Sequence, residues 1–452
     1  MKIIIGILCI AVVGFVVSSA LKSDYRKKHE GHGFDYMNGF STTDFRGYHV
    51  YDGEKLAALD HAPEFMINDP DEMPVLDGAE ACYPLYCAAA KTLYQNIGEI
   101  EAGTSKEKCN GRIVQFTNTV YAYERLVDRE NDIVFAARPS ASQKEIAKSK
   151  IEQICTVPIA KEAFVFFVQK DNPIDNLTSE QIRAIYHGDI TNWKEVGGKN
   201  EKILAYQRPE DSGSQVMMKY FMGDTELKEP ETYEYIGGMG DVIRRVAQYA
   251  DENGAMGYTF KYFLTGLQQE KNVKIISIDG IEPTAENIRN GSYPAVANVV
   301  MAYLASNENP NVQKMIDFML SEDGQYLVEK TGYAPLGEKA EVRIENELPP
   351  LNIYTNENGQ LTTAEETYIL KWKGTEYRGE FYYYGNMMDD KNLCDRYSLS
   401  FRRNEEPYEI ILQMNGNRLI VTGYLGGDKY STVVTAPPFD DLPATGTEFV
   451  LQ

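Results

Sequence analysis

Apolar and polar positions follow two different patterns along this chain, and the change falls near residue 340. From Met73 to about Gly337, short strand-like apolar runs are separated by segments with helical spacing. The strand-like runs cover residues 132–136, 162–168, 274–278 and 297–303. Strands that alternate with helices are typical of an α/β fold. The pattern therefore predicts an α/β domain over residues 70–340.

One helix start within this domain is specific enough to place. Residues 178–187 have helical spacing, and Thr178 is followed three positions later by Gln181. This is the spacing of a capping box, in which each side chain accepts a hydrogen bond from the backbone N–H of the other residue. The sequence therefore predicts a helix over residues 178–187.

Beyond about residue 338, short alternating segments rich in Tyr and Thr replace the helical ones. They cover residues 376–384, 397–401 and 408–414. Asn415-Gly416 follows the last of them and is a strong signal for a two-residue β-hairpin turn. In that hairpin Leu412 would oppose Leu419 and form one apolar face. We therefore predict a separate small antiparallel β domain over residues 348–452.

The N-terminal segment is apolar from Ile3 to Leu21, behind a single Lys2. A stretch of this length can span a bilayer. Small residues at positions 17–20 also offer a place where a signal peptidase could cut. Residues 1–21 are therefore either a retained signal anchor, which we favour slightly, or a cleaved signal peptide. Residues 22–69 are polar, which predicts a linker. With either fate of residues 1–21, we expect the chain to work outside the cytoplasm. It would be anchored to the membrane, or secreted if the segment is cleaved.

Charge restricts the kinds of partner. The formal net charge of −22 argues against nucleic acid and against anionic membrane surfaces. It does not argue against one small anion, because a local group of backbone N–H donors can outweigh the overall field.

Cysteine and histidine positions give no sign of a metal or cofactor. No C-x-x-C pair or His/Cys cluster has zinc-site spacing. Cys82, Cys87, Cys109 and Cys155 could form disulfides in an oxidising compartment, or could be buried free thiols. No nucleophile–base arrangement is recognisable either. We therefore expect no metal, no cofactor and no catalytic residues, and hence not an enzyme.

A candidate anion site lies between a strand-like run over residues 203–207 and a helical one. Arg208 follows the strand, and Ser212-Gly213-Ser214 opens the helix. Ser212 is a good N-cap, Gly213 allows close approach, and the N–H groups at a helix start favour negative charge. Arg208 could add a two-pronged contact to an oxyanion. An ordinary capped helix beside a surface arginine fits these residues as well, so they leave both interpretations open.

Short motifs in a fixed order extend this local signal over most of the α/β domain. They are Asp77-Gly78 with Tyr83-Pro84-Leu85; residues 117–121 (TNTVY); residues 181–193; Arg208 with Ser212-Gly213-Ser214; residues 254–258 (GAMGY); residues 290–294 (NGSYP); and residues 330–336 (KTGYAPL). From Val75 to about Gly337 the chain thereby resembles the phosphate-binding proteins of ABC transporters, especially the anchored forms of Gram-positive bacteria.

The resemblance implies a two-lobed fold of the type II periplasmic-binding-protein class. Lobe 1 would comprise about residues 70–160 and 298–340, and lobe 2 about residues 161–297. The strand candidates at 162–168 and 297–303 would cross between the lobes, which close on a ligand in the cleft. The implied function is to bind a small inorganic oxyanion, above all phosphate, and to deliver it to an ABC permease. We expect a monomer.

The resemblance also assigns residues to the site. Arg208, Ser212, Gly213 and Ser214 match the second-lobe half. In the first lobe, Thr119 or Thr117 falls where the family places a hydroxyl at a helix start.

Two positions depart from the family pattern. Glu80 stands where the first helix normally starts with Ser or Thr, and Arg138 where phosphate binders often have an aspartate. A carboxylate at Glu80 would repel a bound phosphate if both were desolvated. Arg138 could pair with Glu80, contact the ligand, or lie on the surface. The alternative function is that of a membrane-anchored sensory or interaction protein with an altered or empty cleft.

Overall fold

The structure is a computed structural model of the chain. It describes residues 43–102, 111–230, 236, 238–248, 254–337, 339–389, 392–403, 406–426 and 433–452, without the side chains of residues 385–389 and 392–394. Two compact units are present: residues 1–143 with 155–343, and residues 144–154 with 344–452. The predicted anchor or signal peptide falls outside the described residues. Among the residues described, no helix is both long and apolar enough to cross a membrane.

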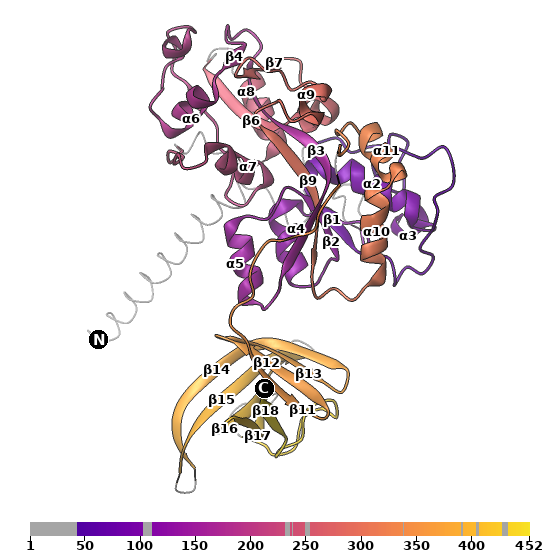
Figure 1. The fold of residues 1–452 in the computed structure, drawn as a ribbon, viewed down its shortest axis with the longest axis vertical. Helices are drawn as coiled ribbons and strands as arrows, with labels where there is room; N and C mark the ends of the chain where they lie inside the picture. Colours follow the sequence, from indigo (N-terminus) through magenta and orange to yellow (C-terminus); the bar gives the residue numbers. More distant parts are fainter. Residues whose placement is uncertain are drawn as a thin grey trace, which may run out of the picture. The chain divides into compact units, whose positions relative to one another are not determined.

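The first unit is built on one mixed sheet with the strand order β1-β2-β9-β3-β6-β5 (Figure 1). β7 and β10 also pair with β3, and β4 pairs with β8 in a separate two-stranded sheet. The strands are β1 (Leu76–Gly78), β2 (Ile133–Ala136), β3 (Ile154–Gln169), β4 (Asn176–Leu177), β5 (Leu204–Ala205), β6 (Ala255–Phe260), β7 (Val273–Ile275), β8 (Ser277–Ile278), β9 (Val296–Leu304) and β10 (Arg343–Ile344).

Two long strands connect the halves of this sheet. β9 runs antiparallel to β2, and β3 runs antiparallel to β6. Since β3 and β9 lie side by side in the middle of the sheet, each extends from one lobe into the other. These are the two crossover strands that the sequence predicts, and the α/β, two-lobed type II fold is confirmed.

Helices surround both lobes (Figure 1). Those of the first lobe are η2 (Glu80–Cys82), α2 (Tyr83–Leu93), α3 (Ile97–Glu101), α4 (Asn118–Val127), α5 (Ala141–Ser149), α10 (Pro310–Leu320) and α11 (Glu322–Thr331). Those of the second lobe are α6 (Ser179–His187), η3 (Trp193–Val196), α7 (Gly213–Met222), α8 (Met239–Gln248), η5 (Phe263–Gln268) and α9 (Ala285–Arg289).

Helix α6 forms where the capping signal predicts it. Thr178 Oγ1 accepts from the N–H of Gln181 at 3.1 Å, and Gln181 Oε1 accepts from the N–H of Thr178 at 2.9 Å. The helix ends at Gly188, whose φ of 104° is in the left-handed region that glycine adopts without a Cβ clash.

Residues 43–69, assigned to a linker from their polar composition, belong to the folded first unit. Phe45, Val50 and Ile67 are buried. The N–H of Ile67 donates to the carbonyl of Leu93 at 2.8 Å, so this segment is also tied to the end of α2.

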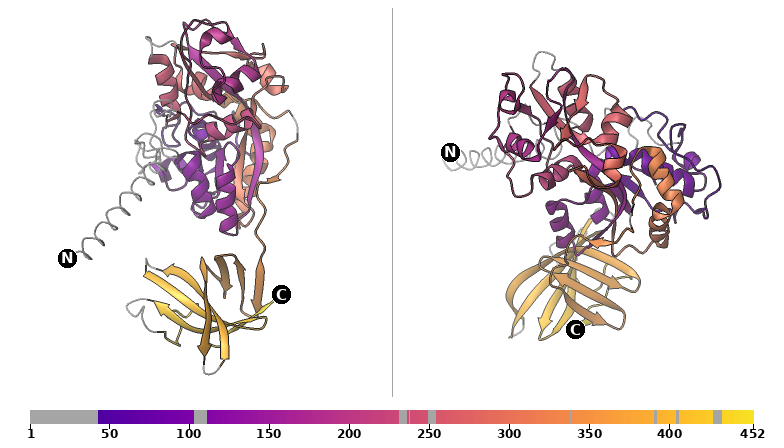
Figure 2. Two further views of the ribbon diagram at one scale, coloured as in Figure 1. Left: turned by 90° about the vertical axis from the view of Figure 1, so that its left-hand side faces the viewer. Right: turned by 45° about the horizontal axis from the view of Figure 1, so that its top comes forward.

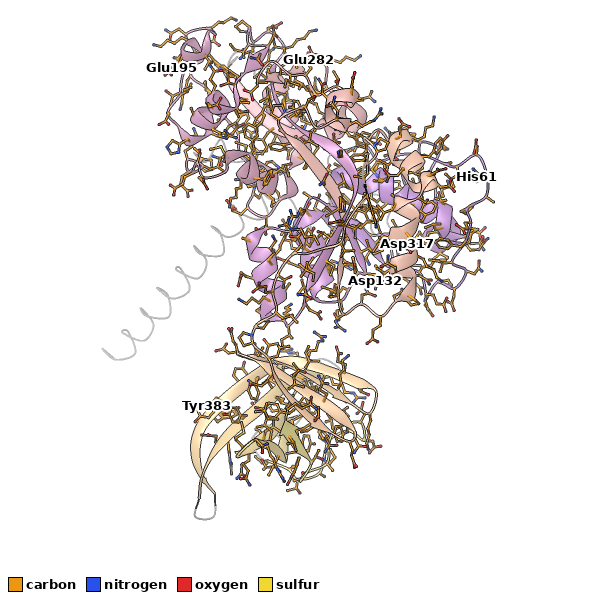
Figure 3. All side chains as sticks on the ribbon, viewed as in Figure 1. His61, Asp132, Glu195, Glu282, Asp317 and Tyr383 are labelled. Atoms are coloured by element: carbon orange, nitrogen blue, oxygen red, sulfur yellow. The ribbon has the colours of Figure 1, made fainter. Side chains whose placement is uncertain are left out.

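The second unit contains a closed barrel in which each strand is antiparallel to the next and β18 returns to β11 (Figure 2). Leu361, Leu370, Leu412, Val421 and Phe449 are part of its apolar core. On β14, the ring of Tyr383 is exposed and points outward (Figure 3). The strands are β11 (Asn352–Asn356), β12 (Gly359–Ala364), β13 (Thr367–Trp372), β14 (Thr375–Asp389), β15 (Asn392–Arg403), β16 (Glu406–Asn415), β17 (Arg418–Gly426) and β18 (Glu448–Leu451). The predicted antiparallel β domain is thus confirmed. Its closure into a barrel was not predicted from the sequence.

The β16–β17 hairpin exists, but its turn differs from the predicted one. Asn415 pairs with Arg418, so Gly416 and Asn417 form the turn rather than Asn415 and Gly416. Gly416 has a φ of 62°. A glycine with positive φ at the first turn position is typical of a type II′ turn, which joins twisted strands as well as the Asn-Gly type does.

Shifting the turn by one residue shifts each cross-strand partner by two. Leu412 therefore opposes Val421, and Leu419 opposes Met414, so the predicted pairing of Leu412 with Leu419 is wrong. Side chains alternate between faces with a period of two, so a two-residue shift leaves the same residues inside. Leu412, Leu419 and Val421 are accordingly all buried in the core.

Cys82, Cys87 and Cys155 are buried and form no disulfide, whereas Cys109 lies outside the described residues. Burial raises the pKa of the Cys82 thiol to about 12. In the described part of the chain, no group of three or more His, Cys, Asp or Glu side chains is arranged to hold a metal ion.

A buried carboxyl lies on the crossover strand β3. Glu162 Oε1 accepts from the N–H of Ala163 at 2.8 Å, and its Oε2 accepts from the N–H of Tyr262 at 3.2 Å. Burial nevertheless raises the pKa of Glu162 from 4.5 to about 7, since desolvation outweighs these bonds. The folded protein thus retains a proton here that the unfolded chain loses.

We predict that Glu162→Gln flattens the dependence of stability on pH. Between about pH 4.5 and 7 the folded wild type binds more protons at this site than the unfolded chain, so its free energy of unfolding falls as pH rises. The variant has no proton to lose, so its stability relative to wild type should increase over that range. Urea unfolding of the full-length protein in detergent at several pH values measures this. A constant stability difference would contradict the prediction.

Candidate functional site

The start of α4 is built on a buried carboxylate. Asp77 is fully buried at the end of β1, and its Oδ1 accepts from the N–H groups of Gly78 and Thr117, both at 2.8 Å. Its Oδ2 accepts from Thr117 Oγ1 at 2.6 Å. Burial raises the pKa of Asp77 to about 6, although these bonds favour its ionised form. Thr117 is hydrogen-bonded to Asp77. The next residues, Asn118 and Thr119, form the N-terminal turn of α4.

The start of α7 is capped as the sequence predicts. Ser212 Oγ accepts from the N–H of Gln215 at 3.3 Å. Asp211 before it has a φ of 65°, an uncommon conformation for a residue other than glycine, which turns the chain sharply into the helix. Ser214 in the first turn is 1 % exposed, and its Oγ has no hydrogen-bond partner among the described residues.

Arg208 is held in place by its backbone and by one end of its guanidinium. Its N–H donates to Tyr258 Oη at 3.0 Å and more weakly to Gln215 Oε1 at 3.3 Å. Its Nη1 donates to the carbonyl of Ile236 at 3.1 Å. The side chain is 6 % exposed, so a permanent positive charge is buried beside the start of α7.

These parts of the two lobes meet at one small cavity. Its volume is about 30 Å³. A single water needs ~10–15 Å³, so the space suits a few atoms and not a large organic ligand. The lining residues are Glu80, Asn118, Thr119, Val120, Arg208, Pro209, Ser212, Gly213, Ser214 and Met239.

The cavity is rich in hydrogen-bond donors. The N-termini of α4 and α7 both face it, and unpaired N–H groups and the helix dipole make such ends favourable for negative charge. Asn118 Nδ2, like Ser214 Oγ, has no hydrogen-bond partner in the part of the chain that the structure describes. Buried donors of this kind are costly unless a water or a ligand satisfies them.

The lobes lie close together at this cavity. A Cβ on Gly213 would be 3.3 Å from Thr119 Oγ1 and 3.6 Å from the Cβ of Ala137, both in the first lobe. Ser142 Oγ donates to Asp211 Oδ1 at 2.5 Å, again from one lobe to the other. A side chain at 213 would therefore require Thr119 to move by a few tenths of an ångström, so glycine favours this close approach of α7 to α4.

The structure places all but one of the predicted site residues around this cavity. Arg208, Ser212, Gly213, Ser214, Thr119 and Glu80 line it. Arg138 is half-buried in the loop after β2 and is not among the lining residues. The three roles considered for Arg138 stay predictions. Of the two threonines, Thr119 lines the cavity, whereas Thr117 is bonded to Asp77.

Sequence reasoning missed several residues here. Asn118 and Val120 lie within the 117–121 motif, so the motif itself could have suggested them. Pro209 follows Arg208 directly. Met239 opens α8 after a glycine-rich stretch, which is a signal for a helix start near the cleft but not for the side chain that faces it.

We predict that Asp77→Ala lowers the free energy of unfolding by about 1–3 kcal/mol at pH 7, because three donors lose their buried acceptor. Urea unfolding of the full-length protein measures the change. The exposed Asp171→Ala is a matched control and should shift stability by less than about 0.5 kcal/mol. Equal effects of the two substitutions would contradict the role given to Asp77.

Comparison with known proteins agrees with this architecture. Residues 90–323 match the family model described as a PBP superfamily domain. The phosphate-binding protein PstS of Borreliella burgdorferi is 29% identical over 196 residues, which cover 42% of this chain and 70% of that protein. PstS of Bacillus subtilis is 28% identical over 268 residues, covering 58% and 80%.

Solved structures are similar to this chain as well. An ABC-type phosphate transport receptor from Vibrio cholerae has a TM-score of 0.43 and 22% identity, over 57% of this chain and 98% of that one. The family model spans more than half of the present sequence, and its range includes both lobes of the cleft. The chain belongs to the PBP superfamily.

Proposed function

We propose that this protein binds phosphate, or a similar small inorganic oxyanion, in the cleft between its lobes. The observation that carries the proposal is the convergence of two helix N-termini, Arg208 and the unpaired hydroxyl of Ser214 on one small cavity. A tetrahedral oxyanion offers acceptors in several directions and can satisfy donors from both lobes at once. Few other ligands of this size would do so.

The names of the relatives support a proposal for the physiological role. Those of Borreliella burgdorferi and Bacillus subtilis carry the name phosphate-binding protein. By analogy, this chain would capture the anion outside the cytoplasm and deliver it to an ABC permease. It would act as a monomer held at the membrane by residues 1–21.

Reversible binding is the chemistry that we propose for this site. Closing the lobes removes water from the anion and exchanges it for fixed N–H and O–H donors. Ser214 Oγ lies at a helix start, and the described contacts give it no general base. In this proposal the cleft holds and releases its ligand.

We predict that Arg208→Ala weakens phosphate binding at least about 30-fold, because truncating a buried charged contact typically costs 2 kcal/mol or more. Isothermal titration of the full-length protein in detergent measures it. Lys219→Ala is a matched control, because Lys219 is an exposed cation on α7 and pairs with Glu210 outside the cavity. Phosphate binding unaffected by Arg208→Ala, or absent from the wild type, would contradict the proposal.

A second candidate function is favoured by one observation. Glu80 places a buried carboxylate on the wall of the same cavity. A negative charge there opposes an anion, and the interaction is strong where water is excluded. The cleft could therefore be altered or empty, and the protein could act as a membrane-anchored sensor or interaction partner.

We predict that Glu80→Ser tightens phosphate binding about ten-fold or more, because it removes this repulsion and restores a hydroxyl. Titration with phosphate and sulfate measures it. Glu286→Ser, on the exposed side of α9, removes the same charge far from the cavity and should leave affinity unchanged. If neither the wild type nor Glu80→Ser binds any oxyanion, the second candidate stands instead.

A further inference from the structure

Thr43, the first residue that the structure describes, contacts a wall of the candidate site. It is 9 % exposed, and its Oγ1 donates to Glu80 Oε1 at 2.5 Å. Gln268 Nε2 in turn donates to Thr43 Oγ1 at 2.6 Å. Glu80 belongs to the first lobe, and Gln268 ends the helical turn η5 of the second. Two hydrogen bonds therefore link one lobe to the other through Thr43.

The directions of these two hydrogen bonds follow from the groups that form them. An ionised carboxylate can only accept, so the single hydroxyl proton of Thr43 must point to Glu80. Thr43 then has only lone pairs to offer Gln268, which must present its amide N–H. The donors run from Gln268 to Thr43 to Glu80, and the last bond is a charge-assisted one, which is stronger than a bond between neutral groups.

The segment that carries Thr43 is fastened beside the cavity by apolar contacts. The ring of Phe45 packs edge-on against Tyr83 at 4.9 Å and against Phe116 at 5.5 Å. His49 Nδ1 is 2.8 Å from Tyr83 Oη. Tyr83 directly follows the turn that bears Glu80, and Phe116 lies two residues before the start of α4. The elements that hold the segment are thus those that also form the first-lobe wall.

Gln268 lies on an unusual element. η5 is a single turn of π-helix, a conformation that is rare and frequently occurs at functional sites. Its end places the amide of Gln268 next to Thr43 rather than in solvent.

We propose that Thr43 is a positioning residue of the anion site, and that the segment over residues 43–49 is a third component of the cleft beside the two lobes. Thr43 fixes Glu80 Oε1 in a hydrogen bond and reduces the negative charge that this carboxylate presents to the cavity. Through Gln268 the same hydroxyl links the first lobe to the second when the cleft is closed. This inference rests on the proposed function, because its main consequence is for anion affinity.

The test is a double-mutant cycle on the full-length protein in detergent, titrated with inorganic phosphate. Thr43→Val removes the hydroxyl and should weaken binding about ten-fold, the equivalent of one charge-assisted hydrogen bond. Thr43→Ser keeps the hydroxyl and should bind as the wild type does. In a Glu80→Gln background, Thr43→Val should have little effect, since the charge that it controls is gone.

A matched control and a second measurement separate the ways this could fail. Thr265→Val, at an exposed position on η5, should not change affinity. An equal loss from Thr43→Val with and without Glu80 would mean a general structural effect and would overturn the inference. The same cycle measured by urea unfolding without any anion should show coupling between Thr43 and Glu80. Coupling without phosphate binding by the wild type would refute the proposed function alone. Binding unaffected by Thr43→Val would refute the inference alone.

Discussion

The interaction on which this site depends is the meeting of two helix N-termini at one small, enclosed space. The first turns of α4 and α7 leave N–H groups that their own helices cannot satisfy, and the cavity between them is about 30 Å³. Burying such donors is unfavourable unless something there accepts from them. Much of the neighbouring structure serves to hold this arrangement. Asp77 fixes the start of α4, Ser212 caps α7, and Gly213 lets the two approach.

Charge inside the cleft is decided locally rather than by the molecule as a whole. The chain carries a formal net charge of −22, yet the cavity contains Arg208 and two positive helix ends. Low-dielectric surroundings make nearby charges count far more than distant, solvent-screened ones. For the same reason Glu80, also buried at this wall, matters more than any surface carboxylate. Its hydrogen bond from Thr43 is buried as well, and we propose that this bond positions the carboxylate.

The predictable parts of the fold are those with strong local signals. The capping box of α6, the Ser212 cap of α7 and the apolar crossover strands formed where the sequence indicates them. The hairpin at Gly416 was predicted with the wrong turn, because Asn-Gly and Gly-Asn both satisfy a two-residue loop and only the packing of both strands chooses between them. Closure of the barrel depends on β11 meeting β18, about a hundred residues later, and no local pattern encodes that pairing.

The sequence by itself determined which residues cap helices, which strand faces are apolar, and which ordered motifs place the chain near oxyanion-binding proteins. These depend on residues a few positions apart, so a linear pattern carries them. Only the tertiary structure decided that Thr119 lines the cavity while Thr117 bonds Asp77, and that Arg138 is not among the lining residues. It alone brought Thr43 to Glu80, and Gln268, more than two hundred residues further along the chain, to Thr43. Such contacts depend on how whole lobes pack, and side-chain chemistry at a single position does not specify them.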